Sequence, residues 1–426
     1  MTREYVRRVV DDELDAHLGG AAAVAIEGPR GVGKTRTATE RAATVIDLSD
    51  RAARIAVAAD PGAALSGPRP VLVDEWQLVP DVWDAVRTAV DRGAEPGSFL
   101  LTGSAVPRAQ PAHPGTGRIL SVRMRPMSLA ERGAGRPAVS LAALLAGSRP
   151  PLSGDTRLRA ADYADEIVAS GLPGLRGVPA RTARAQLDSH LARLVERDYT
   201  ELGGERLRNP VALRRWLVSY AAALSSTASL ETIRDAAAGA AGETPGKSTV
   251  QRYLDVLERL WLVEPVPGWL PSRHALARLT AAPKHQLADP AFAARLLGVG
   301  AGAIAAAGPS PTGIRHRDLL LGAMFESLAT LCVRVYAQAS EARVFHYRTQ
   351  RGEREVDLIV ERDDGRFLGI EVKSARAVAD DDARHLRRLR ADAGDAMLDA
   401  IVLSTGPSAY RRADGIGVVP LALLGA

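Results

Sequence analysis

The stretch Gly28-Pro29-Arg30-Gly31-Val32-Gly33-Lys34-Thr35 decides how the first part of this chain folds. Its glycines, lysine and hydroxyl have the spacing of a loop whose backbone N–H groups wrap phosphates. The apolar run Ala22–Ile26 before it predicts a strand, and a helix is predicted from about Lys34 to Ala43. We expect Lys34 to reach the β- and γ-phosphates of ATP, and the Thr35 hydroxyl to bind Mg²⁺. The alternative is a simple glycine-rich turn before a helix.

A second apolar strand, Val71-Leu-Val, ends in the acids Asp74 and Glu75. Asp74 is expected to hold Mg²⁺ through its water shell, and Glu75 to activate the water that attacks the γ-phosphate. A kinase would not need a carboxylate at the second position, so the pair favours ATP hydrolysis. The alternative is a solvated strand end.

Two further residues are candidates for the γ-phosphate. Thr102 ends the apolar strand that starts at Ser98, and we prefer it to Ser104 as the polar group that senses the phosphate. Arg118 precedes the strand Ile119–Val122, and an arginine there could stabilise the charge of the transition state. In so arginine-rich a chain, Arg118 could equally be a surface residue.

Length and composition limit the class of protein. A chain of 426 residues is expected to form two or three domains. One cysteine, Cys332, excludes an internal disulfide, and the charged N-terminus lacks an apolar signal core. The run Ala21–Ile26 is far too short to span a membrane. These features predict a cytoplasmic protein without a membrane partner.

The basic residues give two indications of function. The weaker one is the net charge, and the sharper one is the scarcity of lysine. A net charge of +5 and a pI near 9.5 mildly favour an anionic partner. Only four of the 55 Lys and Arg residues are lysines, namely Lys34, Lys247, Lys284 and Lys373. Where arginine serves as the general cation, a retained lysine suggests a need for a compact ammonium. Lys34 and Lys373 both fall within chemical motifs.

Alternation of strands and helices over residues 20–130 predicts a parallel sheet covered on both faces. We expect an ATPase domain over residues 1–140, then a linker rich in Gly and Pro around residues 133–155. A mainly helical region is predicted over 155–300. A second α/β domain is predicted over 310–426, so that the whole chain is of the α/β class.

The helical region contains a pattern typical of a winged helix, at about 211–268. Leu230–Ala238 and Lys247–Leu260 would be its second and third helices, and Trp261 would begin a wing strand. Lys247, Arg252 and Arg259 lie where DNA phosphates would be contacted. Tyr253, Leu254, Leu257 and Leu260 are expected to face the core. The alternative is a winged helix that contacts protein.

The last domain carries a second group of acids at strand ends. Glu355-Val-Asp357 and Glu371-Val-Lys373 have the D…E-x-K arrangement of restriction-endonuclease-like folds, and a hairpin would bring the acids together. Asp357 and Glu371 could share a second divalent cation, with Lys373 orienting or activating water. Glu326, on an apolar helix, would be an extra ligand, or an ordinary exposed glutamate. Such folds often persist as binding platforms without cleavage.

These motifs together resemble a large prokaryotic family of AAA-type ATPases fused to a C-terminal domain of unknown function. The resemblance lies in the P-loop, Val71-Leu-Val-Asp-Glu-Trp-Gln, Leu100-Leu-Thr-Gly-Ser, Arg125-Pro-Met-Ser, Gly171-Leu-Pro-Gly, Val195-Glu-Arg-Asp-Tyr, Asp289-Pro-Ala-Phe and Gly322-Ala-Met-Phe-Glu. It covers nearly the whole chain and implies a P-loop NTPase fold of the AAA type, with ATP binding and hydrolysis.

We therefore expect an ATP-hydrolysing enzyme whose nucleotide state controls a C-terminal module associated with nucleic acid, with DNA as the expected partner. An ATP-regulated, metal-dependent nuclease is the first alternative. The second is a signalling ATPase that acts on a protein partner or as a homo-oligomer.

Overall fold

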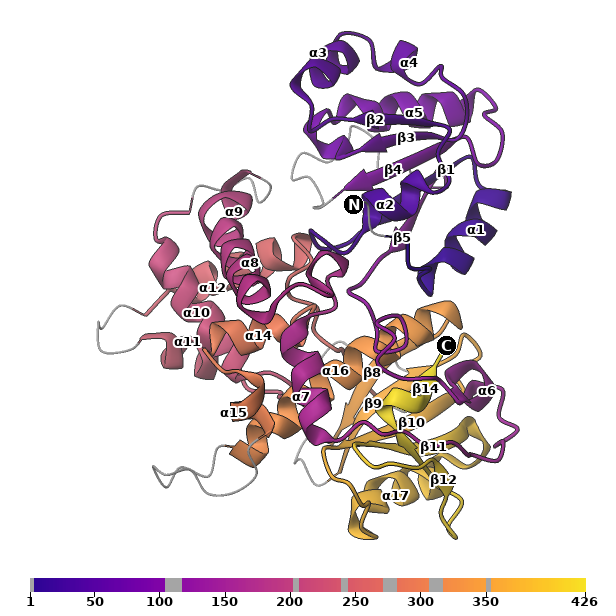
Figure 1. Cartoon of the computed structure of the whole chain (residues 1–426), viewed down its shortest axis with the longest axis vertical. Helices are drawn as coiled ribbons and strands as arrows, with labels where there is room; N and C mark the ends of the chain where they lie inside the picture. Colours follow the sequence, from indigo (N-terminus) through magenta and orange to yellow (C-terminus); the bar gives the residue numbers. More distant parts are fainter. Residues whose placement is uncertain are drawn as a thin grey trace.

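A computed structural model of the chain describes residues 4–103, 117–201, 207–238, 244–270, 282–305, 317–349 and 354–426. Figure 1 shows three parts: a first sheet with its helices at the top, a group of helices at the left, and a second sheet at the bottom. Thr102 lies within the described residues, whereas Ser104 lies outside them.

The first part is a five-stranded sheet in the order β2-β3-β4-β1-β5, and every pairing in it is parallel. The apolar strands β1, β3 and β4 are buried almost throughout, which is typical of a parallel sheet covered on both faces. The predicted parallel α/β fold is thus confirmed. Its elements are α1 (Val10–Gly20), β1 (Ala23–Glu27), α2 (Lys34–Thr39), β2 (Thr44–Asp47), α3 (Arg51–Ala59), α4 (Pro61–Ala64), β3 (Val71–Asp74), η1 (Trp76–Leu78), α5 (Asp81–Asp91), β4 (Phe99–Gly103) and β5 (Ile119–Arg123).

The segment predicted as a linker is packed against the C-terminal part. Its residues form β6 (Val139–Ser140) and α6 (Leu141–Leu145), and β6 pairs in parallel with the final strand β14 (Leu424–Gly425). Leu141 and Leu144 are fully buried. The Gly- and Pro-rich composition concealed this short apolar run, which joins the segment after the first sheet to the C-terminal strand.

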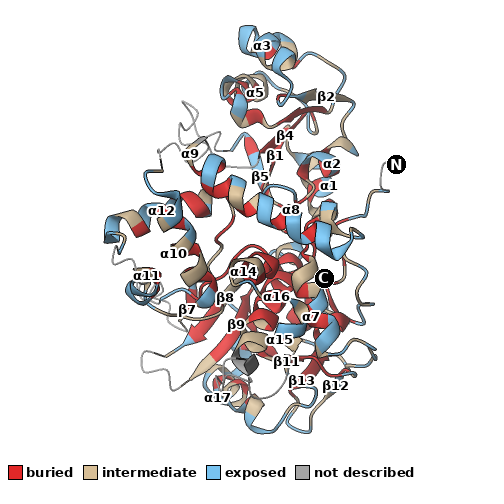
Figure 2. Cartoon of the chain, turned by 60° about the vertical axis from the view of Figure 1, so that its left-hand side comes forward, coloured by how far each residue is buried: buried red, intermediate tan, exposed pale blue. Residues whose placement is uncertain are grey.

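The middle part is helical, as expected. Three of its helices, α10, α11 and α12, precede two isolated antiparallel bridges, Val263 with Leu287 and Val266 with Lys284. The predicted core positions of α12, Tyr253, Leu254 and Leu257, are buried, and Figure 2 shows its exposed side in pale blue. The helices are α7 (Ala160–Ala169), η2 (Pro173–Leu175), α8 (Ala180–Arg193), η3 (Leu194–Asp198), α9 (Tyr199–Glu201), α10 (Pro210–Ala222), α11 (Leu230–Ala238), α12 (Lys247–Arg259), α14 (Pro290–Leu296) and α15 (Ala301–Ala305).

The C-terminal part is a mixed seven-stranded sheet in the order β12-β13-β11-β10-β9-β8-β7. Strands β8, β9 and β10 are antiparallel neighbours, whereas β10, β11 and β13 run parallel. The strand β7 belongs to the middle part and extends this sheet. The elements are β7 (Gly268–Trp269), α16 (Arg317–Ala339), β8 (Arg343–Arg348), β9 (Glu355–Glu361), β10 (Phe367–Lys373), η5 (Asp381–Ala383), α17 (Arg384–Ala393), η6 (Gly394–Ala396), β11 (Met397–Ser404), β12 (Tyr410–Arg411), β13 (Gly417–Pro420) and η7 (Leu421–Leu423).

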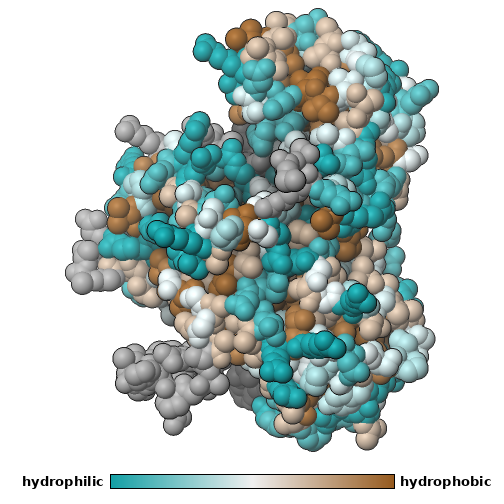
Figure 3. All heavy atoms as spheres, viewed as in Figure 1, coloured by the Kyte–Doolittle hydropathy of each residue, from teal (hydrophilic) through white to brown (hydrophobic). Residues whose placement is uncertain are grey.

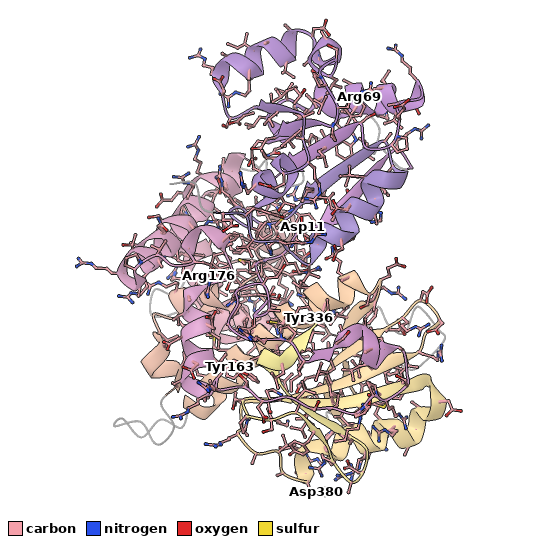
Figure 4. The ribbon with its side chains drawn as sticks, turned by 45° about the vertical axis from the view of Figure 1, so that its right-hand side comes forward. Asp11, Arg69, Tyr163, Arg176, Tyr336 and Asp380 are labelled. Atoms are coloured by element: carbon pink, nitrogen blue, oxygen red, sulfur yellow. The ribbon has the colours of Figure 1, made fainter. Side chains whose placement is uncertain are left out.

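Helix α16 connects all three parts. Within it, Leu320–Ala339 is long and apolar enough to cross a membrane, but 72% of that window is buried inside the protein, as in the core helix of a globular fold. The face seen in Figure 3 mixes hydrophilic and hydrophobic residues. Figure 4 labels Tyr336 and Tyr163 in the interior, where their hydroxyls accept hydrogen bonds from the backbone N–H groups of Ala130 and Ala422. The three parts therefore share one core.

Candidate nucleotide-binding site

The P-loop leaves the carboxyl end of β1 and enters α2. Gly31 and Gly33 have φ angles of 85° and 103°, which favour glycine because a side chain is strained there. A Cβ on Gly28 would lie only 2.1 Å from the carbonyl oxygen of Met124. The ammonium of Lys34 donates hydrogen bonds to the carbonyls of Gly28 at 2.8 Å and Pro29 at 3.0 Å. Lys34 is 5% exposed, and burial lowers its pKa to about 8.

The predicted magnesium ligands meet where the start of α2 faces the end of β3. Thr35 Oγ1 donates to the Asp74 carboxylate, at 2.8 Å from Oδ1 and 3.0 Å from Oδ2. The hydroxyl of Thr102 donates to the same carboxylate from β4. Because the strands are parallel, their carboxyl ends meet beside the P-loop. Burial raises the pKa of Asp74, while the two hydroxyl hydrogen bonds oppose that shift.

Glu75 follows β3 in an uncommon backbone conformation. Its φ of 55° and ψ of 43° lie in the left-handed region, which is unusual for a glutamate and recurs at functional sites. The amide of Gln77 donates to the Glu75 carboxylate. On the neighbouring strand, a Cβ on Gly103 would lie 2.9 Å from both Gln77 Oε1 and Trp76 Nε1. The turn after β3 thus depends on a glycine beside it.

The turn Gly171-Leu-Pro-Gly packs directly onto the P-loop. Leu172 lies 3.8 Å from the position of a Cβ on Gly31, and Pro173 lies 3.4 Å from that of Gly33. Asp289 fastens this turn, because its carboxylate accepts hydrogen bonds from Ser170 Oγ at 2.6 Å and from Gly171 N at 2.7 Å. Asp289 also caps α14 by accepting from Ala291 N. These contacts give the Asp289-Pro motif a physical role that its sequence did not disclose.

An N-terminal arm closes the other side of the loop. The Arg8 guanidinium donates to the carbonyls of Val32 and Arg125, each at 2.9 Å, and to Glu131 Oε1 at 2.8 Å. The arm, the start of α2 and the Gly171 turn enclose a cavity of about 450 Å³, which our sequence analysis did not foresee. Its lining is Glu4, Tyr5, Val6, Arg8, Gly33, Arg36, Thr37, Met124, Met127, Glu131, Arg132, Pro173, Gly174 and Arg176.

An ion pair connects the P-loop to the helical part. Arg30 Nη1 lies 3.1 Å from Asp198 Oδ1, at the end of η3. Asp198 is buried, whereas Arg30 is about half exposed. The pair places a phosphate-binding loop and the Val195-Glu-Arg-Asp-Tyr motif in direct contact.

The structure places Arg118 at the end of the sheet opposite to the P-loop. This residue precedes β5 at its amino end and pairs with Asp91 at 2.6 Å, whereas the P-loop follows the opposite end of the sheet. The arginine at the correct end is Arg123, which is paired in register with Glu27, the last residue before the P-loop. Its guanidinium stacks 3.7 Å from the ring centroid of Trp261 and lies 3.7 Å from Glu264. Burial lowers the pKa of Arg123 to about 10.

At the predicted second cation site, the structure places a lysine beside each of the two strand acids. The β9–β10 hairpin does place Asp357 beside Glu371, since Asp357 Oδ2 accepts from Val372 N at 2.9 Å. However, the Lys284 ammonium lies 3.0 Å from Asp357 and 2.8 Å from Glu326, and Lys373 pairs with Glu371 at 2.7 Å. Across the residues that the structure describes, no group of three or more His, Cys, Asp or Glu side chains could hold a metal ion. The lysines occupy the positions next to the acids.

Two mycobacterial proteins are similar in sequence to this chain. Uncharacterized protein Rv2008c of Mycobacterium tuberculosis and Uncharacterized protein Mb2031c of Mycobacterium bovis are each 30% identical to it over 383 residues, covering 86% of this chain and 74% of the relative. The chain belongs to the family of these mycobacterial proteins. Models of an AAA domain and two domains of unknown function, DUF8612 and DUF4143, match this family member over residues 21–132, 160–302 and 321–424.

One solved structure is also similar to this family member. The Walker-type ATPase PABY2304 of Pyrococcus abyssi has 17% identity and a TM-score of 0.42, over 70% of this chain and 99% of that chain. The AAA-domain match and the parallel sheet with its P-loop support ATPase activity.

Proposed function

We propose that the chain binds ATP at the P-loop and hydrolyses it, and that the nucleotide state acts through the helical part on a C-terminal module associated with DNA. One observation carries the enzymatic part: the Asp74 carboxylate, at the carboxyl end of β3 and immediately before the left-handed Glu75, accepts hydrogen bonds from Thr35 at the start of α2 and from Thr102 near the end of β4.

The roles follow from the positions of the side chains. When ATP binds, the Lys34 ammonium would release the carbonyls of Gly28 and Pro29 and donate hydrogen bonds to the oxygens of the terminal phosphates. Glu75 would take the proton of the attacking water, and Thr102 would donate to the γ-phosphate. The hydroxyl of Thr35 and the carboxylate of Asp74 are hard oxygen donors that suit Mg²⁺, which neutralises phosphate charge when bound.

The base and ribose would enter the cavity beside α2. Its volume of about 450 Å³ is in the range of small-molecule sites, and it begins at Gly33, where the phosphates would end. Met124 and Met127 offer apolar surface to a base, and Arg36 and Thr37 offer polar contacts on the α2 side. Because the Gly171 turn forms one wall, nucleotide binding would bias the position of the helical part.

DNA is proposed as the partner because of the exposed side of α12. Arg252 is exposed on the face opposite the buried Val250, Tyr253 and Leu257. An exposed arginine on a helix is suited to phosphate contacts, whose strength falls steeply with salt. The alternatives are a protein partner for the same surface and a C-terminal nuclease. The pairing of Lys284 with Asp357 disfavours the nuclease.

The test measures ATP turnover by wild type and Lys34→Ala, with and without duplex DNA, together with DNA affinity as salt is varied. We expect turnover only in wild type, a rate altered by DNA, and a salt slope reduced by about one in Arg252→Ala. Arg366→Ala, an exposed arginine paired with Asp364 at 2.8 Å, serves as the matched control. No turnover in wild type would refute the enzymatic proposal, whereas turnover without any DNA effect would redirect it to a protein partner.

A further inference from the structure

The environment of Lys284 is unusual among the basic residues described. Its side chain comes from the segment that forms an isolated bridge with Val266, and it is 1% exposed. Its ammonium lies 2.8 Å from Glu326 Oε1, 3.0 Å from Asp357 Oδ1 and 3.4 Å from Glu355 Oε1. We call these three acids with Lys284 the carboxylate cluster. An ammonium has three N–H donors, so each donor can face one carboxylate.

The carboxylate cluster is assembled from separate elements. Glu326 comes from α16, Glu355 and Asp357 come from β9, and the lysine comes from the end of the helical part. The remaining oxygen of Asp357 accepts from the backbone of Val372 at 2.9 Å. Three carboxylate oxygens therefore surround the ammonium, two of them in hydrogen bonds and the third, of Glu355, in an ion pair at 3.4 Å. Carboxylate oxygens are the donor type that a hard divalent cation prefers.

The neighbouring acid Glu371 is not part of this arrangement. One of its oxygens accepts from Lys373, and the other, Oε2, is buried without a hydrogen-bond partner among the described residues. Each of the two acids predicted to share a metal thus has its own lysine. An entering divalent cation would have to displace a buried ammonium that is already hydrogen-bonded.

The geometry points to Lys284 as an internal cation that takes the place of a divalent metal in the carboxylate cluster and keeps the cluster closed to metal. Because Lys284 lies on the strand segment of the helical part, the same contact ties that part to the C-terminal sheet. The inference concerns this site alone and does not depend on ATP hydrolysis.

The experiment titrates the nucleotide-free full-length protein with Mn²⁺ and follows free Mn²⁺ by electron paramagnetic resonance. The proteins are wild type, Asp357→Asn, Lys284→Met and the double variant Lys284→Met/Asp357→Asn. We expect superimposable curves for wild type and Asp357→Asn, and about tenfold tighter Mn²⁺ binding in Lys284→Met, because three carboxylates then face a cation without competition. The double variant should lose that gain.

Two results would overturn the inference. One is a Mn²⁺ ion bound by wild type and lost in Asp357→Asn, which would mean that the lysine does not exclude metal. The other is a Lys284→Met protein that retains its circular dichroism and ATP turnover but binds Mn²⁺ no better than wild type. If Lys284→Met does not fold, Lys284→Gln replaces it, since an amide is neutral yet can still hydrogen-bond to the carboxylates.

Discussion

Two regions of this protein bury a lysine close to acidic side chains, and the two lysines differ in what surrounds them. Lys34 donates to the neutral carbonyls of the P-loop, and burial lowers its pKa to about 8. Burial would also lower the pKa of Lys284, but Asp357, Glu326 and Glu355 outweigh it and raise that pKa above its ordinary value. A buried ammonium that is poorly neutralised favours binding of an anion, whereas one already surrounded by carboxylates has no need of a ligand.

The largest expected effect is on stability. Lys284→Met leaves carboxylates buried without their cation and should lower the free energy of unfolding by about 3–5 kcal/mol. Lys34→Met removes an ammonium that burial disfavours, so its free energy of unfolding should stay within about 1 kcal/mol of wild type. Urea denaturation of both variants measures the difference.

The stability of Lys284→Met can also be used to detect metal binding. Adding Mn²⁺ should raise the melting temperature of Lys284→Met but not that of wild type, because a ligand that binds only the folded state stabilises it. Equal destabilisation by the two substitutions would show that the contrast between the two lysines is wrong.

The next largest effect is on the rate of ATP hydrolysis. It is tested by the same substitution at Glu75 and at Glu371. Glu75→Gln should reduce kcat for ATP hydrolysis by about a hundredfold or more, because an amide cannot accept the proton of water. Glu371→Gln, the same change at the end of a C-terminal strand, should leave kcat unchanged. Steady-state phosphate release gives both numbers, and fluorescent-nucleotide binding checks that Glu75→Gln still binds ATP. A normal kcat in Glu75→Gln would remove Glu75 from the proposed mechanism.

Much of the first region could be predicted because its chemistry is local in sequence. The P-loop is one continuous stretch, and parallel strands necessarily bring Asp74 and Thr102 to the same edge. The same rule would have excluded Arg118, which precedes its strand, and would have indicated Arg123 at the other end. The cavity beside α2 could not be predicted, since it depends on the N-terminal arm folding back over the loop.

The second region was harder because its decisive contact is not local. Lys284 lies 42 residues from Glu326 and 73 residues from Asp357, and no periodicity connects them. The scarcity of lysine was nonetheless a usable signal. Lys34 and Lys373 were singled out because they are rare lysines within motifs. Lys284 is equally rare but lies in no recognised motif, so it was passed over.

A smaller expected effect is a different pH dependence of binding at the two lysines. The folded-state pKa of Lys34, about 8, is below its ordinary value of 10.5, so the neutral amine accumulates in the folded protein above pH 8. Since the phosphates need the ammonium, ATP affinity should fall about tenfold between pH 7 and pH 9. Lys284 has a raised pKa and stays charged over this range, so Mn²⁺ exclusion from the carboxylate cluster should not change. Fluorescent-nucleotide and Mn²⁺ titrations at both pH values provide the comparison.

The smallest predicted effect is on ATP affinity and concerns the ion pair between Arg30 and Asp198. Asp198 pairs with Arg30 at 3.1 Å, so it competes with phosphate for the guanidinium, as the carboxylates around Lys284 compete with any ligand of that lysine. Asp198→Asn should therefore tighten ATP binding about two- to threefold, which is the scale of a partly exposed ion pair. Asp188→Asn, which breaks the pair of α8 with Arg295 at 2.6 Å, is the matched control and should have no effect. Weaker ATP binding in Asp198→Asn alone would mean that Asp198 positions Arg30 for the phosphates, and the P-loop would then require its neighbouring carboxylate to bind an anion.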